Sequence, residues 1–224
     1  MRIQIYTMQA VAEAERVAGL GVDHIGVTPA NRGLPGEVDP AVAADICAAM
    51  RRVATSVALS IETDLTVIEE MVRTVQPEIL HLCGPPGVLG ATAVTELRKR
   101  LPDVAVMQAI AVTGPESIEV ARSYETAVDF LLLDSVDPAI PGVGAAGAIH
   151  DWEVSAAIVA AVGVPVILAG GLSPDNVADA ISLVQPWGVD SLTHTNRPLA
   201  TGGFRKDLDA VQRFVAAARD VALP

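Results

Sequence analysis

Asp134 is the residue of this chain best placed for proton transfer, because it ends a strongly apolar stretch. The four residues before it, 130–133, are Phe-Leu-Leu-Leu, and Ser135 follows it. Such a run is typical of a buried strand, and a carboxylate at the end of that strand can act as a general acid or base. Asp also caps loops and helices. The apolar run favours the chemical role, so we predict that Asp134 is catalytic.

Four further side chains near predicted strand ends could take part in the same chemistry. His81 and Cys83 share one face of a strand, since Leu82 between them takes the other face. Glu62 follows one predicted strand, and Tyr6 ends another. Capping or packing explains each of them when it is considered alone, and such a cysteine is more often a small core residue. The candidates for a general base are therefore Glu62, Cys83 and Tyr6, with His81 as a substrate-binding residue.

An anion site is predicted where another apolar run ends in Gly170 and Gly171. Ser173 has the residue type of a helix N-cap, and Pro174 suits the first helical position. Glycines let a ligand approach the backbone, and the free N–H groups of a helix start attract a phosphate. A second glycine-rich stretch, 142–147, offers more backbone donors. The residues expected to complete the phosphate site are Gly144, Thr193 and His194.

Arg32 is a candidate for holding the other end of a ligand. It lies in the stretch Thr-Pro-Ala-Asn-Arg-Gly at 28–33, directly after a predicted strand. A guanidinium group can bind a carboxylate or phosphate through two parallel hydrogen bonds. An arginine in a surface loop is the plainer interpretation, and the two stay open at this point.

The elements that must position these residues alternate along the whole chain. Short β-rich runs are separated by stretches with apolar residues three and four apart, which is typical of helices covering a parallel sheet. Eight such units in 224 residues favour a closed (βα)8 barrel, an α/β fold, in a single domain over residues 1–224. The predicted strands are 2–6, 24–27, 56–60, 79–82, 104–111, 129–134, 165–169 and 189–192.

Composition limits the partners of such a barrel. The net charge of −12 and the pI near 4.6 disfavour nucleic acid, so a phosphorylated ligand must be held by local groups. Cys47 and Cys83 lie far apart without a zinc-binding spacing, and no apolar run reaches the length of a membrane span. We expect a cytoplasmic monomer or homodimer that binds a phosphorylated small molecule, with no metal, cofactor or membrane.

Several of these stretches together resemble the phosphoribosylanthranilate isomerase family of tryptophan biosynthesis. Their spacing fits that family over nearly the whole chain. They are Leu-His-Leu-Cys-Gly at 80–84, Leu-Leu-Leu-Asp-Ser at 131–135, Gly-Ala-Ala-Gly at 144–147 with Asp-Trp at 151–152, Leu-Ala-Gly-Gly-Leu-Ser-Pro-Asp-Asn-Val at 168–177, Gly-Val-Asp at 188–190 and Lys-Asp at 206–207.

The resemblance implies a (βα)8 barrel that performs an Amadori rearrangement without a cofactor. A phosphoribosylamine is opened, and a proton leaves C2 to give a 1-amino-1-deoxyketose phosphate. Asp134 matches the family's general acid, and Arg32 falls where the family binds anthranilate. The chain departs from the family pattern at the base, where Tyr6 replaces a cysteine on the first strand. The other departures are Glu62 for an asparagine, His81 and Cys83 in the strand-four motif, and Leu-Thr-His at 192–194 for Ser-Ser-Gly.

Three hypotheses follow from this pattern. The first is an isomerase of a phosphorylated sugar or sugar amine, with Asp134 retained and the base supplied by Glu62, Cys83 or Tyr6. The second is a barrel that binds a phosphosugar without turning it over, which the loss of the first-strand cysteine favours. The third is a lyase on a phosphosugar, since barrels of this kind carry many chemistries.

Overall fold

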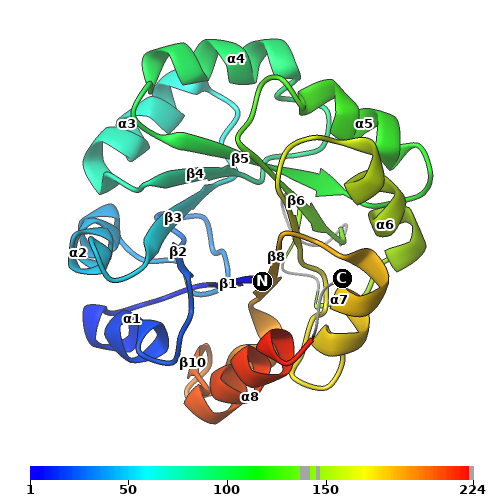
Figure 1. Ribbon diagram of the computed structural model, residues 1–224. Helices are drawn as coiled ribbons and strands as arrows, with labels where there is room; N and C mark the ends of the chain where they lie inside the picture. The colour runs from blue at the N-terminus through cyan, green and yellow to red at the C-terminus, as the bar shows by residue number, and fades with distance from the viewer. Residues whose placement is uncertain (137–141, 145–146, 222–224) are drawn as a thin grey trace.

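The computed structural model describes residues 1–136, 142–144 and 147–221. Within them, eight parallel strands close into a barrel, and β8 pairs with β1 to complete it (Figure 1). The (βα)8 prediction is confirmed. The strands are β1 (Arg2–Ile5), β2 (His24–Val27), β3 (Thr55–Ser60), β4 (Ile79–Leu82), β5 (Ala105–Ala111), β6 (Phe130–Asp134), β7 (Val166–Leu168) and β8 (Gly188–Ser191).

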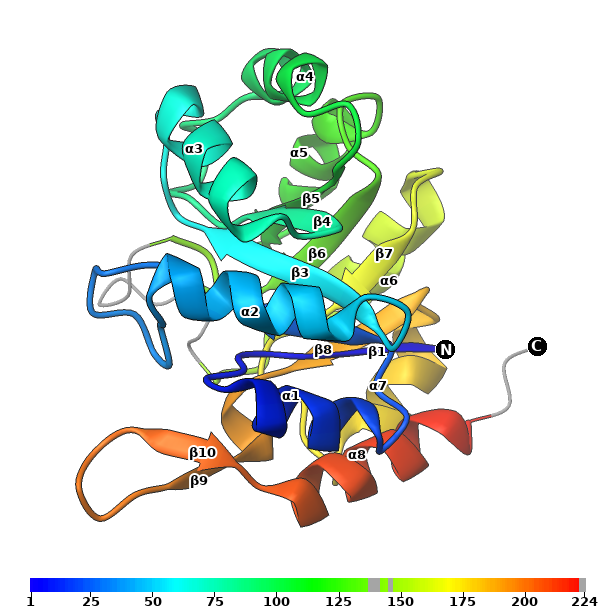
Figure 2. The same ribbon diagram turned by 90° about the vertical axis from the view of Figure 1, so that its left-hand side faces the viewer.

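Helices surround this barrel on its outside, as Figures 1 and 2 show. Several of them begin at an aspartate whose carboxylate accepts backbone N–H groups of the first turn, as Asp64 does before α3 and Asp207 before α8. The helices of the described part are α1 (Val11–Ala18), α2 (Pro40–Met50), α3 (Leu65–Val75), α4 (Ala91–Arg100), α5 (Ser117–Tyr124), α6 (Trp152–Ala161), α7 (Val177–Val184) and α8 (Leu208–Arg219).

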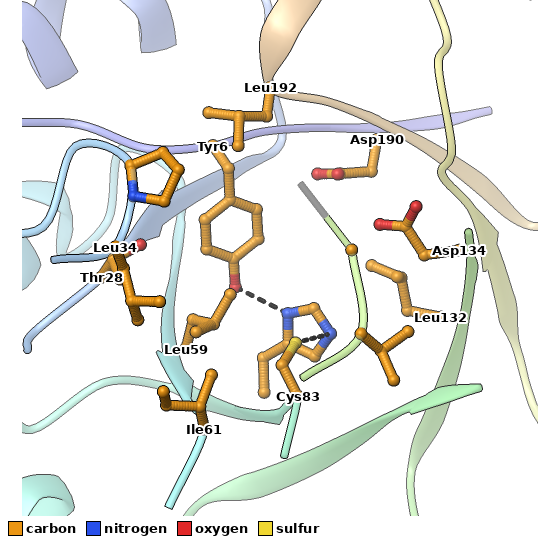
Figure 3. Close-up of a pocket in the computed structure, with 14 residues that line it drawn as sticks. Tyr6, Thr28, Leu34, Leu59, Ile61, Cys83, Leu132, Asp134, Asp190 and Leu192 are labelled. Carbon is orange, nitrogen blue, oxygen red and sulfur yellow. Dashed lines mark hydrogen bonds between the residues drawn. The ribbon is translucent and has the colours of Figure 1, made fainter. Parts of the chain in front are cut away.

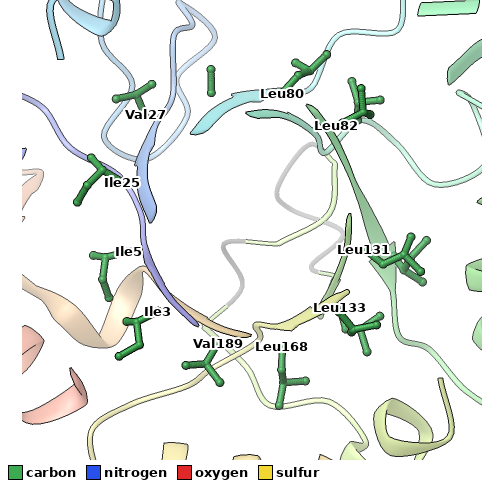
Figure 4. Packing of buried hydrophobic residues seen from close by; sticks show 14 of the residues in the cluster. Ile3, Ile5, Ile25, Val27, Leu80, Leu82, Leu131, Leu133, Leu168 and Val189 are labelled. Carbon is green, nitrogen blue, oxygen red and sulfur yellow. The ribbon is translucent and has the colours of Figure 1, made fainter. Parts of the chain in front are cut away.

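Alternation of side chains along the strands divides the core into two layers. The larger layer fills the space between strands and helices, with Leu82, Leu131 and Leu133 pointing away from the barrel axis (Figure 4). The smaller layer lies inside the barrel and includes Val57, Met107, Leu132 and Ile167, together with the ring of Tyr6. Because Leu82 points outward, its neighbours His81 and Cys83 face the interior.

One predicted helix start is wrong. We expected Ser173 as the N-cap and Pro174 in the first turn, but α7 begins at Val177 with Asn176 as its N-cap. The Ser173 hydroxyl accepts the N–H of Asp175, and the Asn176 side chain bonds back to Ser173 N and Gly171 O. These local bonds make a turn of the Ser-Pro-Asp-Asn segment, and the helix starts after it.

A short antiparallel hairpin was not predicted from the sequence. It pairs β9 (Asn196–Pro198) with β10 (Phe204–Lys206) after a single 3-10 turn, η1 (Thr193–Thr195). Part of the glycine-rich stretch, Ala145 and Ala146, lies outside the described residues. Among the residues that are described, no helix is long and apolar enough to cross a membrane.

Candidate active site

A cavity opens at the end of the barrel where the strands finish (Figure 3). Most of its lining is apolar, which gives it walls of low polarity around a few polar groups. The apolar lining comprises Leu34, Pro35, Leu59, Ile61, Leu132, Val143 and Leu192. The side chains able to titrate or hydrogen-bond there are Tyr6, Thr28, His81, Cys83, Asp134 and Asp190.

Three of these polar side chains form a buried hydrogen-bonded array across the cavity. The Tyr6 hydroxyl lies 3.0 Å from Nδ1 of His81, and the Cys83 Sγ lies 3.1 Å from Nε2 of the same ring (Figure 3). All three residues are at most 4% exposed. The Tyr6 ring also needs Gly26, because a Cβ there would lie 2.3 Å from the ring. The chain thus makes room on β2 for the tyrosine that follows β1.

Burial keeps every member of this array uncharged. It lowers the pKa of His81 to about 3 and raises the pKa of the Tyr6 phenol well above its usual range. The pKa of the Cys83 thiol is also raised, first by burial and then by the charges of Asp134 and Asp190. At neutral pH the array therefore consists of a phenol, a neutral imidazole and a thiol.

Asp134 ends β6 and lines the same cavity, as its sequence context predicted. Burial raises the pKa of its carboxyl to about 7. The N–H and hydroxyl of Ser135 donate hydrogen bonds to Oδ1, which lowers the pKa by a smaller amount. A carboxyl group with a pKa near neutrality can donate a proton and take it back. Gly144 lies close beside it, since a Cβ there would be 2.7 Å from Oδ2 of Asp134.

Asp190 is a further carboxyl group of the site to which we assigned no role from the sequence. It lies on β8, is 7% exposed, and lines the cavity together with Asp134. Burial and then the charge of Asp134 raise its pKa to about 8, and its Oδ1 has no hydrogen-bond partner within the described residues. An acidic residue in the middle of a buried strand was the available signal, because such a group is costly to bury without a function.

A second, smaller pocket adjoins the first and shares Asp134 and Asp190 with it. Its other walls bring together four of the five residues predicted to bind phosphate, whereas the fifth, Gly144, lines the first cavity. Gly170 and Gly171 have φ values of +78° and +66°, which only glycine adopts easily. The residues lining this pocket also include Gly147, Leu172, Ser191, Leu192, Thr193 and His194.

The glycine pair also has a packing role that the sequence did not reveal. A Cβ on Gly171 would lie 2.8 Å from the backbone of Ala148, and one on Gly170 would lie 2.5 Å from the His150 ring. The segment 147–150 therefore approaches the turn closely. His194 faces the same segment, with its Nε2 3.4 Å from the Gly147 carbonyl.

Arg32 and Glu62 contact each other and do not line the cavity. The Arg32 Nη2 lies 2.6 Å from the Glu62 Oε1, and both side chains are partly open to solvent. The loop around Arg32 is held by Glu37, which accepts the backbone N–H groups of Arg32, Gly33 and Leu34. The structure therefore brings Tyr6, His81, Cys83, Asp134 and Gly144 together, and it leaves Arg32 and Glu62 outside as a pair.

Lys206 is a second buried charged residue to which the sequence gave no role. It lies on β10, and its ammonium group donates to the Tyr6 carbonyl and to Oδ1 of Asn196. Burial lowers the pKa of Lys206 to about 7. The hairpin thus fixes the backbone at the end of β1, where the Tyr6 side chain turns into the cavity.

Comparison with known proteins decides the family. A family model described as N-(5'phosphoribosyl)anthranilate (PRA) isomerase matches residues 7–216. The chain belongs to this family. The N-(5'-phosphoribosyl)anthranilate isomerase of Haloferax volcanii is 33% identical over 97% of this chain and 93% of its own length. Isomerase 2 of Methanosarcina mazei is 30% identical over 98% of this chain and 95% of its own length.

Solved structures agree with the PRA isomerase assignment. The phosphoribosyl anthranilate isomerase of Thermococcus kodakaraensis has a TM-score of 0.75 with 28% identity, covering 98% of this chain and 99% of its own. In the cavity of this chain, Tyr6 stands at the place where the resemblance described from the sequence implies a cysteine.

Proposed function

We propose that the protein is an isomerase of a phosphoribosylamine, of the PRA isomerase type, with Asp134 as its general acid. One observation carries this proposal: Asp134 lines both the apolar cavity and the glycine-walled pocket, and its carboxyl has a pKa of about 7. A proton donor at the junction of a phosphate pocket and an apolar cavity suits a substrate with a phosphate at one end and an aromatic amine at the other.

The two pockets suggest how such a substrate binds. The phosphate would lie against the Gly170–Gly171 turn, Thr193 and His194, where backbone N–H groups and polar side chains surround a small space. The aromatic amine would occupy the cavity lined by Leu34, Ile61 and Val143. The ribose then bridges the two pockets beside Asp134 and Asp190.

In this arrangement Asp134 starts the rearrangement. Its proton goes to the ring oxygen of the ribose while the C1–O bond breaks, and the nitrogen lone pair forms a C1=N iminium. The electron-poor C1=N group makes the C2 proton acidic, so a base on the enzyme can remove it. The resulting enolamine becomes the 1-amino-1-deoxyketose when C1 gains a proton and the C2 hydroxyl returns its proton to Asp134.

The proposal is tested with phosphoribosylanthranilate and the Asp134→Asn variant. We expect the wild type to convert the substrate and Asp134→Asn to lose turnover by about 10²- to 10⁴-fold, the usual contribution of acid–base catalysis. Thermal stabilisation by inorganic phosphate should be equal in both proteins. Turnover that survives in Asp134→Asn would contradict the proposal.

Binding without turnover is the second candidate, and Tyr6 favours it. A buried phenol whose pKa is raised cannot replace a cysteine as a base at neutral pH. Complementation of a strain that lacks PRA isomerase separates the two functions. Growth with the wild-type gene supports the enzyme, whereas phosphosugar binding without growth, even after Tyr6→Cys, supports the binding protein.

The setting that we propose for this activity is the cytoplasm. Both cysteines are buried and free, which fits a reducing compartment. The net charge of −12 argues against nucleic-acid partners, so the partner that we propose is the phosphorylated substrate alone, bound to a monomer or homodimer.

A further inference from the structure

The proposed function leaves the base that removes the C2 proton without an identity. Tyr6 occupies the expected place but is uncharged, and Glu62 lies outside the cavity in an ion pair with Arg32. Cys83 remains among the candidates, and it faces the cavity from β4 with only 2% of its surface exposed. Its Sγ lies 3.1 Å from Nε2 of His81, as the Tyr6 hydroxyl lies 3.0 Å from Nδ1, and of these two groups the thiol has the lower usual pKa.

We propose that the Cys83 thiol, coupled to the His81 imidazole, is the group that accepts the C2 proton. This inference rests on the proposed isomerase function. His81 and Tyr6 are positioning residues in it. With hydrogen on Nδ1, the His81 ring donates to the Tyr6 oxygen and leaves Nε2 free to accept the Cys83 S–H, which fits the distances of 3.0 Å and 3.1 Å.

The proton transfer balances within this array. As the C2–H bond breaks, its proton goes to Sγ and the S–H proton passes to Nε2. The electron pair of the C2–H bond forms the C1=C2 double bond, and the C1=N π electrons return to nitrogen. Later Sγ gives a proton to C1 and regains one from Nε2. No oxidant, metal or cofactor takes part in these steps.

Charges of the site favour this route over a free thiolate. Asp134 becomes a carboxylate when it protonates the ring oxygen, so the imidazolium that forms on His81 appears beside a new negative charge. A free thiolate at Cys83 would instead add a second negative charge next to Asp134 and Asp190, whose charges raise the pKa of the thiol. The Tyr6 oxygen accepts the Nδ1–H throughout and steadies the imidazolium.

The chain provides a matched control for the decisive variant. It has two cysteines, and Cys47 is buried on α2 and is not among the residues lining the cavity. We expect Cys83→Ala to lower kcat by about 10²- to 10⁴-fold with KM for phosphoribosylanthranilate nearly unchanged. Cys47→Ser should keep the wild-type kcat. Thermal stabilisation by inorganic phosphate reports whether each variant is folded.

His81→Gln and Tyr6→Phe test the positioning roles through the split between kcat and KM. Both should lower kcat more than they change KM, with the larger loss in His81→Gln, because the amide cannot accept and return the proton. If Cys83→Ala proves unfolded, alkylation of Cys83 with iodoacetamide in the Cys47→Ser background replaces it. Loss of turnover in step with alkylation supports the base, and full turnover after complete alkylation overturns it.

The outcomes also separate this inference from the proposed function. A Cys83→Ala protein with kcat within about threefold of Cys47→Ser, together with an inactive Asp134→Asn, would overturn the base and leave the isomerase intact. A wild type that binds phosphate but never converts phosphoribosylanthranilate would overturn the isomerase, and the inference with it.

Discussion

The guanidinium group of Arg32 is 2.6 Å from the carboxylate of Glu62. Arg32 was predicted to bind an acidic group of the substrate, and in the structure it forms an ion pair with an acidic side chain of the protein itself. The resemblance to the PRA isomerase family implies an asparagine where Glu62 stands. If Arg32 binds a substrate carboxylate, as that resemblance implies, the carboxylate competes with Glu62 for it. Both side chains are partly exposed, and such a pair is weak enough for a ligand to displace.

Glu62→Gln is accordingly predicted to lower KM for phosphoribosylanthranilate. We expect a change of about twofold to fivefold, the range of a partly exposed ion pair, with kcat unchanged. Steady-state kinetics at low ionic strength measures it best, because salt screens the pair. In an Arg32→Ala background the same substitution should have no effect on KM. A fall in kcat at constant KM would instead make Glu62 a proton-transfer group and count against Cys83.

The pH dependence of turnover should reveal Asp134. The general acid must hold its proton in the free enzyme, and its carboxyl has a pKa of about 7. We therefore expect kcat/KM to fall as pH rises through about 7. His81 stays a neutral proton acceptor down to about pH 3, so no loss is expected between pH 7 and pH 5.

The groups that face His81 and Cys83 in the cavity are Tyr6, Asp134 and Asp190, and the two carboxyl groups influence each other. The fall in kcat/KM above about pH 7 therefore reflects the titration of both carboxyl groups together rather than of one residue. A rise in kcat/KM centred between pH 8 and pH 10 would indicate a thiolate base and contradict proton transfer through His81.

Much of the barrel could be predicted because strand boundaries depend on local alternation. Every predicted strand agrees with an observed one to within one residue at each end, for example 79–82 with Ile79–Leu82 and 104–111 with Ala105–Ala111. The shared face of His81 and Cys83 followed from the same alternation, and the structure shows that this face points into the cavity. The start of α7 could not be found in this way, because Ser173 and Asn176 have the residue types of both a cap and a turn.

The contacts of the site depend on barrel closure, which no local pattern contains. Tyr6 and His81 are 75 residues apart and meet because β1 and β4 face each other across the barrel. Asp190 comes close to Asp134 because only β7 separates β8 from β6. Arg32 and Glu62 were predicted as separate ligand-binding and catalytic candidates, and only the arrangement of two loops shows that they pair.

Gly171→Ala is predicted to weaken the phosphate pocket. The alanine would have φ near +66° and a Cβ 2.8 Å from the backbone of Ala148, so the segment 147–150 must move. Gly33→Ala is a matched control, because Gly33 has φ +80° but nothing within 4 Å of its Cβ position. Backbone strain of about 1–3 kcal/mol applies to both, which corresponds to a Tm decrease of roughly 2–10 °C.

Only Gly171→Ala should also raise KM and reduce the thermal shift produced by inorganic phosphate. Titration of both variants with phosphate in a thermal-unfolding assay makes the comparison. Equal phosphate shifts in Gly171→Ala and Gly33→Ala would show that phosphate binds elsewhere.

Asp190→Asn is predicted to stabilise the protein, and by more at high pH. Burial raises the pKa of Asp190 from the usual 3.8 of an aspartate to about 8, so the folded state prefers the protonated form. The stabilisation of the folded state by protonated Asp190 is therefore present at low pH and is lost as pH rises toward 8. Asparagine has no charge to bury, so the Tm difference between variant and wild type should grow from pH 5 to pH 9, on the order of 5 °C.

Lys206 does not reverse this trend. Burial lowers the pKa of Lys206 to about 7, and below that pH Asp190 is itself protonated, so Asp190→Asn removes no charge that stabilises the ammonium group. Asp45→Asn, at an exposed position of α2, is the control and should follow the wild-type Tm at every pH. A Tm advantage of Asp190→Asn that shrinks as pH rises would mean that the folded protein prefers the Asp190 carboxylate. That result would also remove the reason to regard Asp190 as a protonated partner of Asp134 in the cavity.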